Sequence, residues 1–465
     1  MYLERCRIRN IKCFEDVALD FRNPDGTVRL WNVLIGENGT GKTTLLQAIA
    51  IALLGEKAAS VLLPRPRGWV RTDTTKGEIA ATFHPGNLDM IVTWADTETS
   101  RDQDKPLEVS YEIEPTDASL QDDEAAIRET TADLIREKLR TARRSMPTAW
   151  FAAGYGPFRR LGGGTEHASR IGETNTREAR FVTLFLEGAA LSDGEAWLMD
   201  LDYARRDDSD EEQRQRSESL LKLIWETLND NLLPEGVQLR VITSRGVFFS
   251  TPYSDKVRMS DLSDGYRAML AMMIDLLRQL SQSFKDFLEM WPRLDELSGV
   301  VLIDEIDAHL HPTWQREIGL WLKKQFPQMQ FIVATHSPFI TQAADAGGLY
   351  VLRQPDNGTA AVAIHQDEES VRGWRVDQIL TSDLFGLETT RSPEVEAQLA
   401  RYDELLSKQV QGQLTSTEKD ELASLEQQLE ELLPAPGETI GQRDFYRRLQ
   451  EYIDKTLEAP RQTYD

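Results

Sequence analysis

A glycine-rich stretch near the N-terminus contains the residue types that hold a polyphosphate. Residues 36–43 read GENGTGKT and fit the pattern G-x-x-x-x-G-K-[ST] in full. The pattern lies between a predicted buried strand at 28–35 and a predicted helix at 42–54, which is the context it requires. Backbone N–H groups of such a loop point at phosphate oxygens, and the helix N-terminus adds partial positive charge. We call residues 36–44 the phosphate loop, and its expected binding residues are Gly36, Asn38, Gly39, Thr40, Gly41, Lys42, Thr43 and Thr44.

Two side chains of the phosphate loop have more specific expected roles. Lys42 is expected to bridge the β- and γ-phosphates and so to act in catalysis, and the hydroxyl of Thr43 is expected to bind Mg²⁺. The loop therefore predicts a nucleoside triphosphate with Mg²⁺ as the bound pair.

A pair of acids follows a second buried strand. Residues 300–307 read VVLIDEID, so an apolar run ends in two carboxylates. Open α/β sheets bind ligands at the carboxyl ends of their strands, which is where these acids emerge. Asp304 is expected to orient Mg²⁺, and Glu305 is expected to act as general base or to polarise the attacking water.

A third strand ends in a histidine. Residues 331–338 read FIVATHSP, and a neutral imidazole at position 336 can hydrogen-bond both a γ-phosphate and the attacking water. We therefore include His336 among the candidate catalytic residues.

A second turn suited to anions lies far from the phosphate loop. Residues 262–265, LSDG, directly precede a helix predicted from about 266 to 280, and we call them the signature turn. Its amides, the Ser263 hydroxyl and the helix dipole make an anion pocket that includes Gly265. One γ-phosphate is not easily contacted by two such turns of the same subunit. We therefore expect Ser263 and Gly265 to complete the site of a second copy, in a homodimer or a higher homo-oligomer.

The four motifs in this order resemble the ATP-binding-cassette (ABC) ATPases of the SMC/RecF/Rad50 branch, and the resemblance spans residues 1–352. It implies an α/β fold: an ABC-type ATPase head that has a P-loop sheet with an antiparallel β subdomain. It also implies ATP and Mg²⁺ as cofactors and a slow, switch-like ATPase activity. The sequence IDAHLHP at 306–312 resembles the compact RecF- and OLD-like ATPases of bacterial defence operons.

Two features near these motifs leave alternatives open. His309 and His311 have a spacing that suits a metal, although as family-typical turn residues they need none. No glutamine matches the Q-loop of ABC ATPases, and AAGYGPFRR at 152–160 stands at roughly that place. Arg159 or Arg160 is accordingly a candidate for a contact with phosphate or with a partner.

Four segments are expected along the chain. Residues 1–120 and 236–365 form the two parts of the head, residues 121–235 a mostly helical insertion, and residues 366–465 a helical extension. Within the insertion, residues 122–144 have a charged helical pattern, which a glycine-rich basic segment follows.

Charge and composition restrict the choice of partners. The 465 residues contain 53 Lys and Arg against 77 Asp and Glu, a net charge of −24. This argues against a chain-wide DNA-binding surface, although a local basic groove at 136–145 or 156–161 remains open. No apolar run has membrane-spanning length and no signal peptide is evident, so a cytoplasmic protein with no membrane contact is expected. Cys6 and Cys13 are expected to be reduced thiols.

The extension resembles that of compact ATPases paired with a separate nuclease, as in the Septu anti-phage system. The resemblance implies docking of an effector nuclease of HNH or TOPRIM type, and the chain itself is expected to lack a nuclease. One alternative is a RecF-like DNA repair ATPase that clamps DNA. Another is an ATP-dependent scaffold that sequesters a toxin nuclease until a phage trigger is present, as in the PARIS system.

Overall fold

A computed structural model describes residues 1–64, 66, 68–84, 106–114, 127–133, 135–136, 151–159, 171–172, 176–191, 194–207, 209–233, 236–284, 288, 293–354, 361–367 and 369–432. The chain divides into two compact units, Met1–Gly386 and Leu387–Asp465. The predicted division into four segments stays a prediction.

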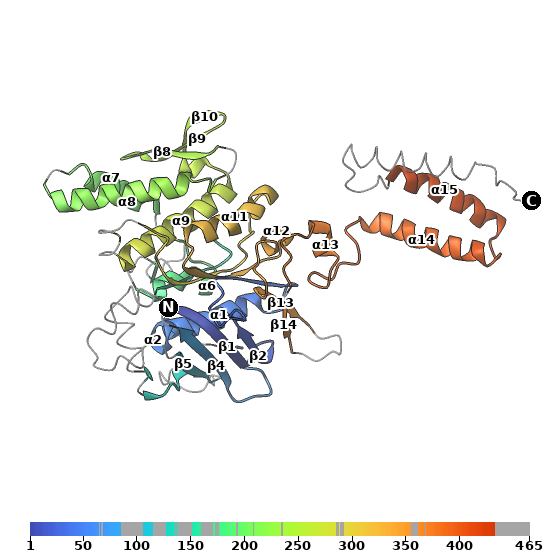
Figure 1. Cartoon of the computed structure of the whole chain (residues 1–465), viewed down its shortest axis with the longest axis horizontal. Coiled ribbons are helices and arrows are strands. Elements are labelled where there is room, and N and C mark those ends of the chain that lie inside the picture. Colours follow the sequence, from blue (N-terminus) through green and yellow to red (C-terminus); the bar gives the residue numbers. More distant parts are fainter. Residues whose placement is uncertain are drawn as a thin grey trace, which may run out of the picture. The chain divides into compact units, whose positions relative to one another are not determined.

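A six-stranded sheet forms the centre of the first unit (Figure 1). Its strands, in spatial order, are β14 (Ala363–Asp367), β13 (Leu349–Arg353), β3 (Trp31–Gly36), β12 (Met329–Ala334), β11 (Gly299–Ile303) and β7 (Ala152–Tyr155). All pairs are parallel except β13 with β14. The predicted strands that carry the phosphate loop, the histidine and the acids are therefore β3, β12 and β11, which are neighbours.

Alternate residues of the central sheet enter two different hydrophobic clusters. Val33, Val301 and Val333 belong to one cluster, whereas Leu34 and Leu302 belong to the other. The first cluster includes residues of α9 (Asp264–Ser283) and α11 (Pro312–Gln325), and the second includes α1 (Lys42–Leu54). Because both faces are covered, these strands are apolar throughout their length, which is the pattern that made them recognisable.

An antiparallel sheet covers the α1 side. Its order is β2 (Phe14–Asp20), β1 (Tyr2–Ile11), β4 (Gly77–His84), β5 (Leu107–Ile113) and β6 (Ile127–Glu129). β1 alternates buried apolar residues with arginines, and Arg7 on its exposed side donates to Asp16 of β2 at 2.8 Å. The predicted fold class, an α/β body with a P-loop sheet and an antiparallel β subdomain, is confirmed.

Two strands, β6 of the antiparallel sheet and β7 of the central sheet, lie within residues 121–235, which were expected to be mostly helical. Residues 127–129 were expected to be helical, but they form β6, because Ile127 is buried and pairs with Ile113 of β5. The glycine-rich segment contains β7, which pairs with β11 from Ala152↔Val300 to Tyr155↔Ile303. β7 has four residues, two of them alanine and one glycine, so its own pattern gives no strand signal.

The remaining elements of the first unit are shorter or lie at its edge. A three-stranded antiparallel sheet has the order β10 (Ser254–Arg258), β9 (Gly246–Thr251) and β8 (Gln238–Thr243). The helices are α2 (Glu56–Leu62), η1 (Glu178–Phe181), α6 (Val182–Phe185), α7 (Gly194–Ala204), α8 (Glu211–Asn229), η2 (Met259–Asp261), α12 (Pro338–Thr341) and α13 (Val376–Leu380).

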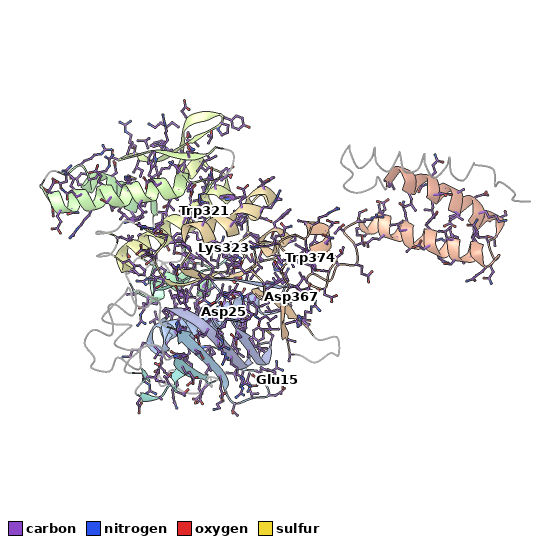
Figure 2. All side chains as sticks on the ribbon, in the orientation of Figure 1. Glu15, Asp25, Trp321, Lys323, Asp367 and Trp374 are labelled. Atoms are coloured by element: carbon purple, nitrogen blue, oxygen red, sulfur yellow. The ribbon has the colours of Figure 1, made fainter. Side chains whose placement is uncertain are left out.

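Polar contacts fasten α11, which directly follows the loop after the acids. Figure 2 labels Trp321 and Lys323 of this helix. The indole of Trp321 donates to the carbonyl of Asp230 at 2.7 Å, and the ammonium of Lys323 donates to Asp345 at 2.7 Å. These contacts join α11 to the end of α8 and to the loop before β13.

The second unit contains two helices, α14 (Pro393–Val410) and α15 (Ser416–Leu432). They pack through buried leucines at 405, 422 and 429, and the Arg401 guanidinium donates to both oxygens of Glu421. The helical character expected of the extension is confirmed for these two segments. In the described part of the chain, no helix combines the length and the apolar character needed to cross a membrane.

We expect a chain that ends at Gly386 to fold and to keep nucleotide-dependent thermal stabilisation. Both hydrophobic clusters consist of residues up to Leu384, so this cut removes none of them. Circular dichroism and melting curves with and without ATP·Mg²⁺ would measure this.

The matched control ends at Asp367 and removes Val371, Ile379 and Leu384 from the first cluster. Its melting temperature should fall well below that of the longer truncation, since each buried side chain contributes about 1.5–3 kcal/mol. Aggregation of both truncated chains alike would contradict the prediction.

Candidate nucleotide-binding site

The phosphate loop needs glycine at two positions for different reasons. Gly39 and Gly41 have φ of +82° and +92°, a region that L side chains rarely adopt. A Cβ at position 39 would meet nothing within 4 Å, whereas one at position 41 would collide with Cys13 and lie 2.9 Å from the ring of Phe14. The turn between β1 and β2 and the start of β2 therefore pack directly against the loop.

Lys42 lies folded into the loop. Its ammonium donates to the carbonyls of Gly36 at 2.8 Å and of Glu37 at 3.0 Å. Burial lowers its pKa, and the negative charges of three nearby acids, at positions 304, 305 and 307, oppose that shift. The cation is therefore held by two neutral carbonyls, which phosphate oxygens can replace.

Thr43 and Asp304 meet across the site. The Thr43 hydroxyl donates to Oδ2 of Asp304 at 2.6 Å, and Oδ1 of Asp304 is buried without a hydrogen-bond partner. Burial raises the pKa of Asp304 above its usual value, and the Thr43 hydrogen bond opposes the shift. A hydroxyl beside a buried carboxylate with a free oxygen is an oxygen donor set that suits Mg²⁺, so these residues fit the expected ion.

Glu305 has an unusual backbone. Its φ is +45°, in the left-handed region that costs a non-glycine residue about 1 kcal/mol. Its carbonyl accepts from the N–H of Ala308 at 2.9 Å and from Nη2 of Arg159 at 2.9 Å. The Glu305 side chain is half-buried, and it directly follows Asp304, the acid that is bonded to Thr43 of the phosphate loop.

The third acid of DEID joins the acid strand to the histidine strand. Asp307 accepts a hydrogen bond from the Thr335 hydroxyl and one from the His336 N–H at 3.4 Å. Ser337, the next residue but one after Thr335, donates to Gln315 of α11 at 2.7 Å. The loop that carries His336 is therefore fixed to the loop after the acids and to α11.

The surroundings of His336 favour the neutral form of its imidazole, because its pKa is lowered. Burial lowers its pKa, the charge of Lys42 lowers it further, and three acids, Asp307, Glu305 and Asp304, oppose the shift. A neutral imidazole here can donate one hydrogen bond and accept another, as the sequence prediction requires.

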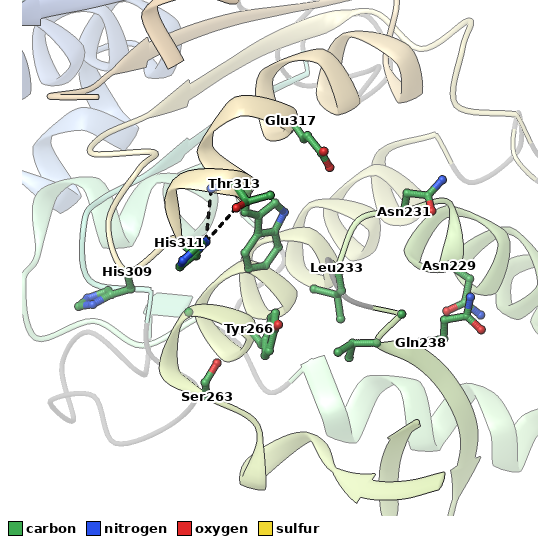
Figure 3. Close-up of a pocket in the computed structure, with 14 residues that line it drawn as sticks. Asn229, Asn231, Leu233, Gln238, Ser263, Tyr266, His309, His311, Thr313 and Glu317 are labelled. Carbon is green, nitrogen blue, oxygen red and sulfur yellow. Dashed lines mark hydrogen bonds between the residues drawn. The ribbon is translucent and has the colours of Figure 1, made fainter. Parts of the chain in front are cut away.

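The signature turn lines a cavity that the phosphate loop does not line. Ser263 is the exposed N-cap of α9 and makes no side-chain capping bond. A Cβ at Gly265 would collide with the carbonyl of His309, so the loop after the acids packs directly on the turn. The cavity has a volume of about 670 Å³, and Figure 3 shows Ser263, Tyr266, His309 and His311 around it. No residue of the phosphate loop lines this cavity.

His309 and His311 have separate structural roles. His309 has φ of +65° and its carbonyl faces Gly265. His311 is the N-cap of α11, and its Nδ1 accepts from the Thr313 N–H at 3.4 Å (Figure 3). Among the described residues, no group of three or more histidines, cysteines or acids could hold a metal ion. Both cysteines are free thiols, and burial raises the pKa of Cys6 to about 12.

Arg159 contacts the main chain of the two acids that follow β11. Its Nη2 donates to the carbonyls of Asp304 at 2.5 Å and of Glu305 at 2.9 Å. Burial lowers its pKa to about 10 against the opposing charges of the three acids. This contact with main-chain carbonyls differs from the expected contact with phosphate or partner. Arg160 and residues 137–145 of the other basic cluster lie outside the described residues.

The sequence predicted that one nucleotide site contains Lys42, Thr43, Asp304, Glu305 and His336. It predicted that the signature turn serves the site of a second copy. It assigned no role to Asp307, Thr335 or Gln315. The sequence did contain a signal for Asp307. A third acid so soon after a buried strand is costly to bury unless it finds a hydrogen-bond partner, so a structural contact could have been expected.

Comparison with known proteins shows the family of the chain. Residues 31–341 match the family described as "AAA domain, putative AbiEii toxin, Type IV TA system". The "Septu protein PtuA" of Bacillus mycoides (strain KBAB4) is 26% identical over 453 residues, 97% of this chain and 54% of PtuA. The chain thus spans about half the length of that relative.

A second relative matches a quarter of the chain, and a solved structure aligns with most of it. The "Retron Ec83 probable ATPase" of Escherichia coli is 36% identical over 118 residues, 25% of this chain and 20% of that protein. Among solved structures, the SMC head bound to the C-winged helix domain of ScpA aligns over 79% of this chain and 98% of its own, at 16% identity and a TM-score of 0.49.

We predict that Gly41→Ala destabilises the nucleotide-free protein more than Gly39→Ala does. Both substitutions incur left-handed strain of about 1 kcal/mol. Only the first also forces a methyl group into Cys13 and Phe14, which adds about 1–3 kcal/mol. Chemical denaturation of both variants without nucleotide measures the difference, and equal destabilisation would contradict the packing described here.

Proposed function

Because the chain belongs to the AAA-domain family of ATPases, we propose that it binds ATP with Mg²⁺ at the phosphate loop and hydrolyses it in a site that a second copy completes. The observation that carries this proposal is the Thr43–Asp304 hydrogen bond of 2.6 Å, beside a buried and unpartnered carboxylate oxygen. It joins the phosphate loop to the acid strand at the point where a triphosphate would meet Mg²⁺.

The residues of the chain divide the chemical work. Thr43 and Asp304 would hold Mg²⁺, which supplies neutralising charge on phosphate oxygens when bound. Lys42 exchanges its two loop carbonyls for phosphate oxygens, and the loop amides stabilise the charge that develops in the transition state. Glu305 accepts a proton from the attacking water.

His336 orients that water from the neighbouring strand. Because its pKa is lowered, the imidazole is neutral at pH 7 and can accept or donate a hydrogen bond. The bonds of Asp307 to the Thr335 hydroxyl and the His336 N–H make the histidine loop sensitive to the position of the acids.

The second copy supplies Ser263 and Gly265. Support comes from the exposure of Ser263, from its lack of a capping bond, and from the separation of its cavity from the phosphate loop. A hydroxyl and backbone amides at the N-terminus of a 20-residue helix are suited to a phosphate that another subunit holds.

We further propose a role in anti-phage defence, in which ATP holds an assembled state that restrains or licenses a separate nuclease effector. Support comes from the similarity to a Septu protein over 97% of this chain, which includes α14 and α15, and from the similarity to retron ATPases. The extension, with its exposed acids on α14 and α15, is the proposed docking element for a basic effector.

Light-scattering mass with and without ATP·Mg²⁺ tests the shared site. Glu305→Gln should trap a dimer or larger species with ATP, because assembly occurs and hydrolysis does not. Ser263→Arg should abolish that species, and Ser209→Arg is a matched control that adds the same charge at an exposed position elsewhere. A mass that ignores nucleotide in all variants would overturn the shared-site proposal.

The hydrolysis rate should fall at acid pH. The folded pKa of His336 lies below 6.5, so the imidazole stays neutral down to that lowered pKa and is protonated only below it. The rate at saturating ATP should therefore decline below pH 6.5, and His336→Gln should be slower overall and lack that part of the decline. The pH profile of both proteins between pH 5 and 8 measures it, and identical profiles would exclude the role of His336.

A further inference from the structure

We propose that Arg159 is a positioning residue, whose guanidinium sets the direction of the Glu305 carboxylate by holding the Glu305 backbone. The inference rests on the proposed role of Glu305 in hydrolysis. It assigns a role in the reaction to a residue that need touch neither nucleotide nor water.

The guanidinium is enclosed by main-chain acceptors. Arg159 is 5% exposed, and its Nε donates to the carbonyl of Gly156 at 3.2 Å. Its Nη2 donates to the carbonyls of Asp304 at 2.5 Å and Glu305 at 2.9 Å. Hydrogen bonds from a charged donor are stronger than neutral ones, and they hold both acids at the end of β11.

The end of β11 needs such a donor. Its pairing with β12 ends at Ile303↔Val333, so the carbonyl of Asp304 extends beyond the parallel ladder into buried surroundings. A buried carbonyl without a donor costs about 1–3 kcal/mol. Arg159 therefore satisfies an acceptor that the sheet leaves without a partner strand.

The strain at Glu305 gives this contact a consequence for chemistry. At φ of +45° the Cα–Cβ bond of Glu305 points in a direction that a right-handed backbone would not give. Strain of this kind persists only where the surroundings impose it. Without the bond from Nη2, the backbone can relax and turn the carboxylate away from the attacking water.

The turn after β7 brings Arg159 to this position. The N–H of Asp304 donates to the carbonyl of Tyr155 at 2.8 Å, so β7 ends beside the acids. A Cβ at Gly156 would collide with the carbonyl of Thr183, so only glycine allows the chain to turn there. Three residues later Arg159 reaches back and closes the turn through its bond to the Gly156 carbonyl.

The test compares Arg159→Gln and Arg159→Lys with a matched control, Arg180→Gln. Arg180 is also a buried arginine, 7% exposed, and burial lowers its pKa to about 10, but it packs on the ring of Phe151. Melting temperature, the dissociation constant of a fluorescent ATP analogue, and kcat are measured for each full-length variant.

We expect Arg159→Gln to lower kcat by about 10–100-fold, the effect of a misplaced catalytic group. Its affinity for the analogue should change by less than about 3-fold, because Lys42 and Thr43 bind the phosphates themselves and are bonded to Gly36 and Asp304 instead of Arg159. Arg159→Lys should retain intermediate activity, since its ammonium can replace Nη2 at the Asp304 and Glu305 carbonyls but cannot also keep the bond that Nε makes to Gly156. Arg180→Gln should lower the melting temperature with little change in kcat.

Non-additivity separates positioning from general destabilisation. If Arg159 acts through Glu305, then Arg159→Gln added to Glu305→Gln causes no further loss of the residual rate. A further loss in the double variant, or a kcat of Arg159→Gln equal to that of Arg180→Gln, would overturn the inference.

The same set distinguishes the inference from the proposed function. A Glu305→Gln protein that keeps its kcat removes the proposed role of Glu305 and with it the basis of the inference. An inactive Glu305→Gln protein beside a fully active Arg159→Gln protein overturns the inference alone.

Discussion

The site depends on a hydrogen bond between Thr43 and Asp304, two residues that lie 261 positions apart in the sequence. The bond can form because β3, β12 and β11 are adjacent and parallel, so that the phosphate loop, His336 and the acids leave the sheet at one edge. In the register Val33↔Val333 and Ile303↔Val333, β11 and β12 end within one residue of each other, and β3 continues beyond Val33 to Gly36. The chemistry of the site thus follows from the order of three strands.

The charges gathered at this edge are held at a cost in stability. Burial lowers the pKa of Lys42 and raises that of Asp304, so both groups are shifted toward their neutral forms although opposite charges lie near. Lys42 is bonded to carbonyls and Oδ1 of Asp304 has no partner, so the protein leaves these groups incompletely satisfied. The proposed binding of phosphate and a cation would recover this cost, which is the usual compromise between stability and activity at catalytic sites.

The sequence was informative wherever local pattern determines structure. β3, β11 and β12 are buried on both faces and read as apolar runs, and α1 ends at the predicted residue, Leu54, before a glycine. β6 and β7 were missed because three or four residues carry little pattern of their own, and only their partners β5 and β11 make them strands. The direction of Arg159 was missed for the same reason. It is set by the turn at Gly156 and by the unpaired end of β11, neither of which is visible from the sequence around Arg159.

One buried contact links the two parts of the molecule that the shared-site proposal needs. α9 begins at the signature turn, and Asp275 in its middle accepts a hydrogen bond from the Tyr155 hydroxyl at 3.1 Å. The carbonyl of the same Tyr155 accepts from the N–H of Asp304. A displacement of α9 on binding a partner's phosphate would therefore act on the strand that positions Arg159 and the acids. Tyr155 of the edge strand β7 thus contacts both α9 and the acids. Under the shared-site proposal, β7 is one route by which occupancy at one ATP site would influence hydrolysis at the other, beside the packing of the His309 carbonyl on Gly265.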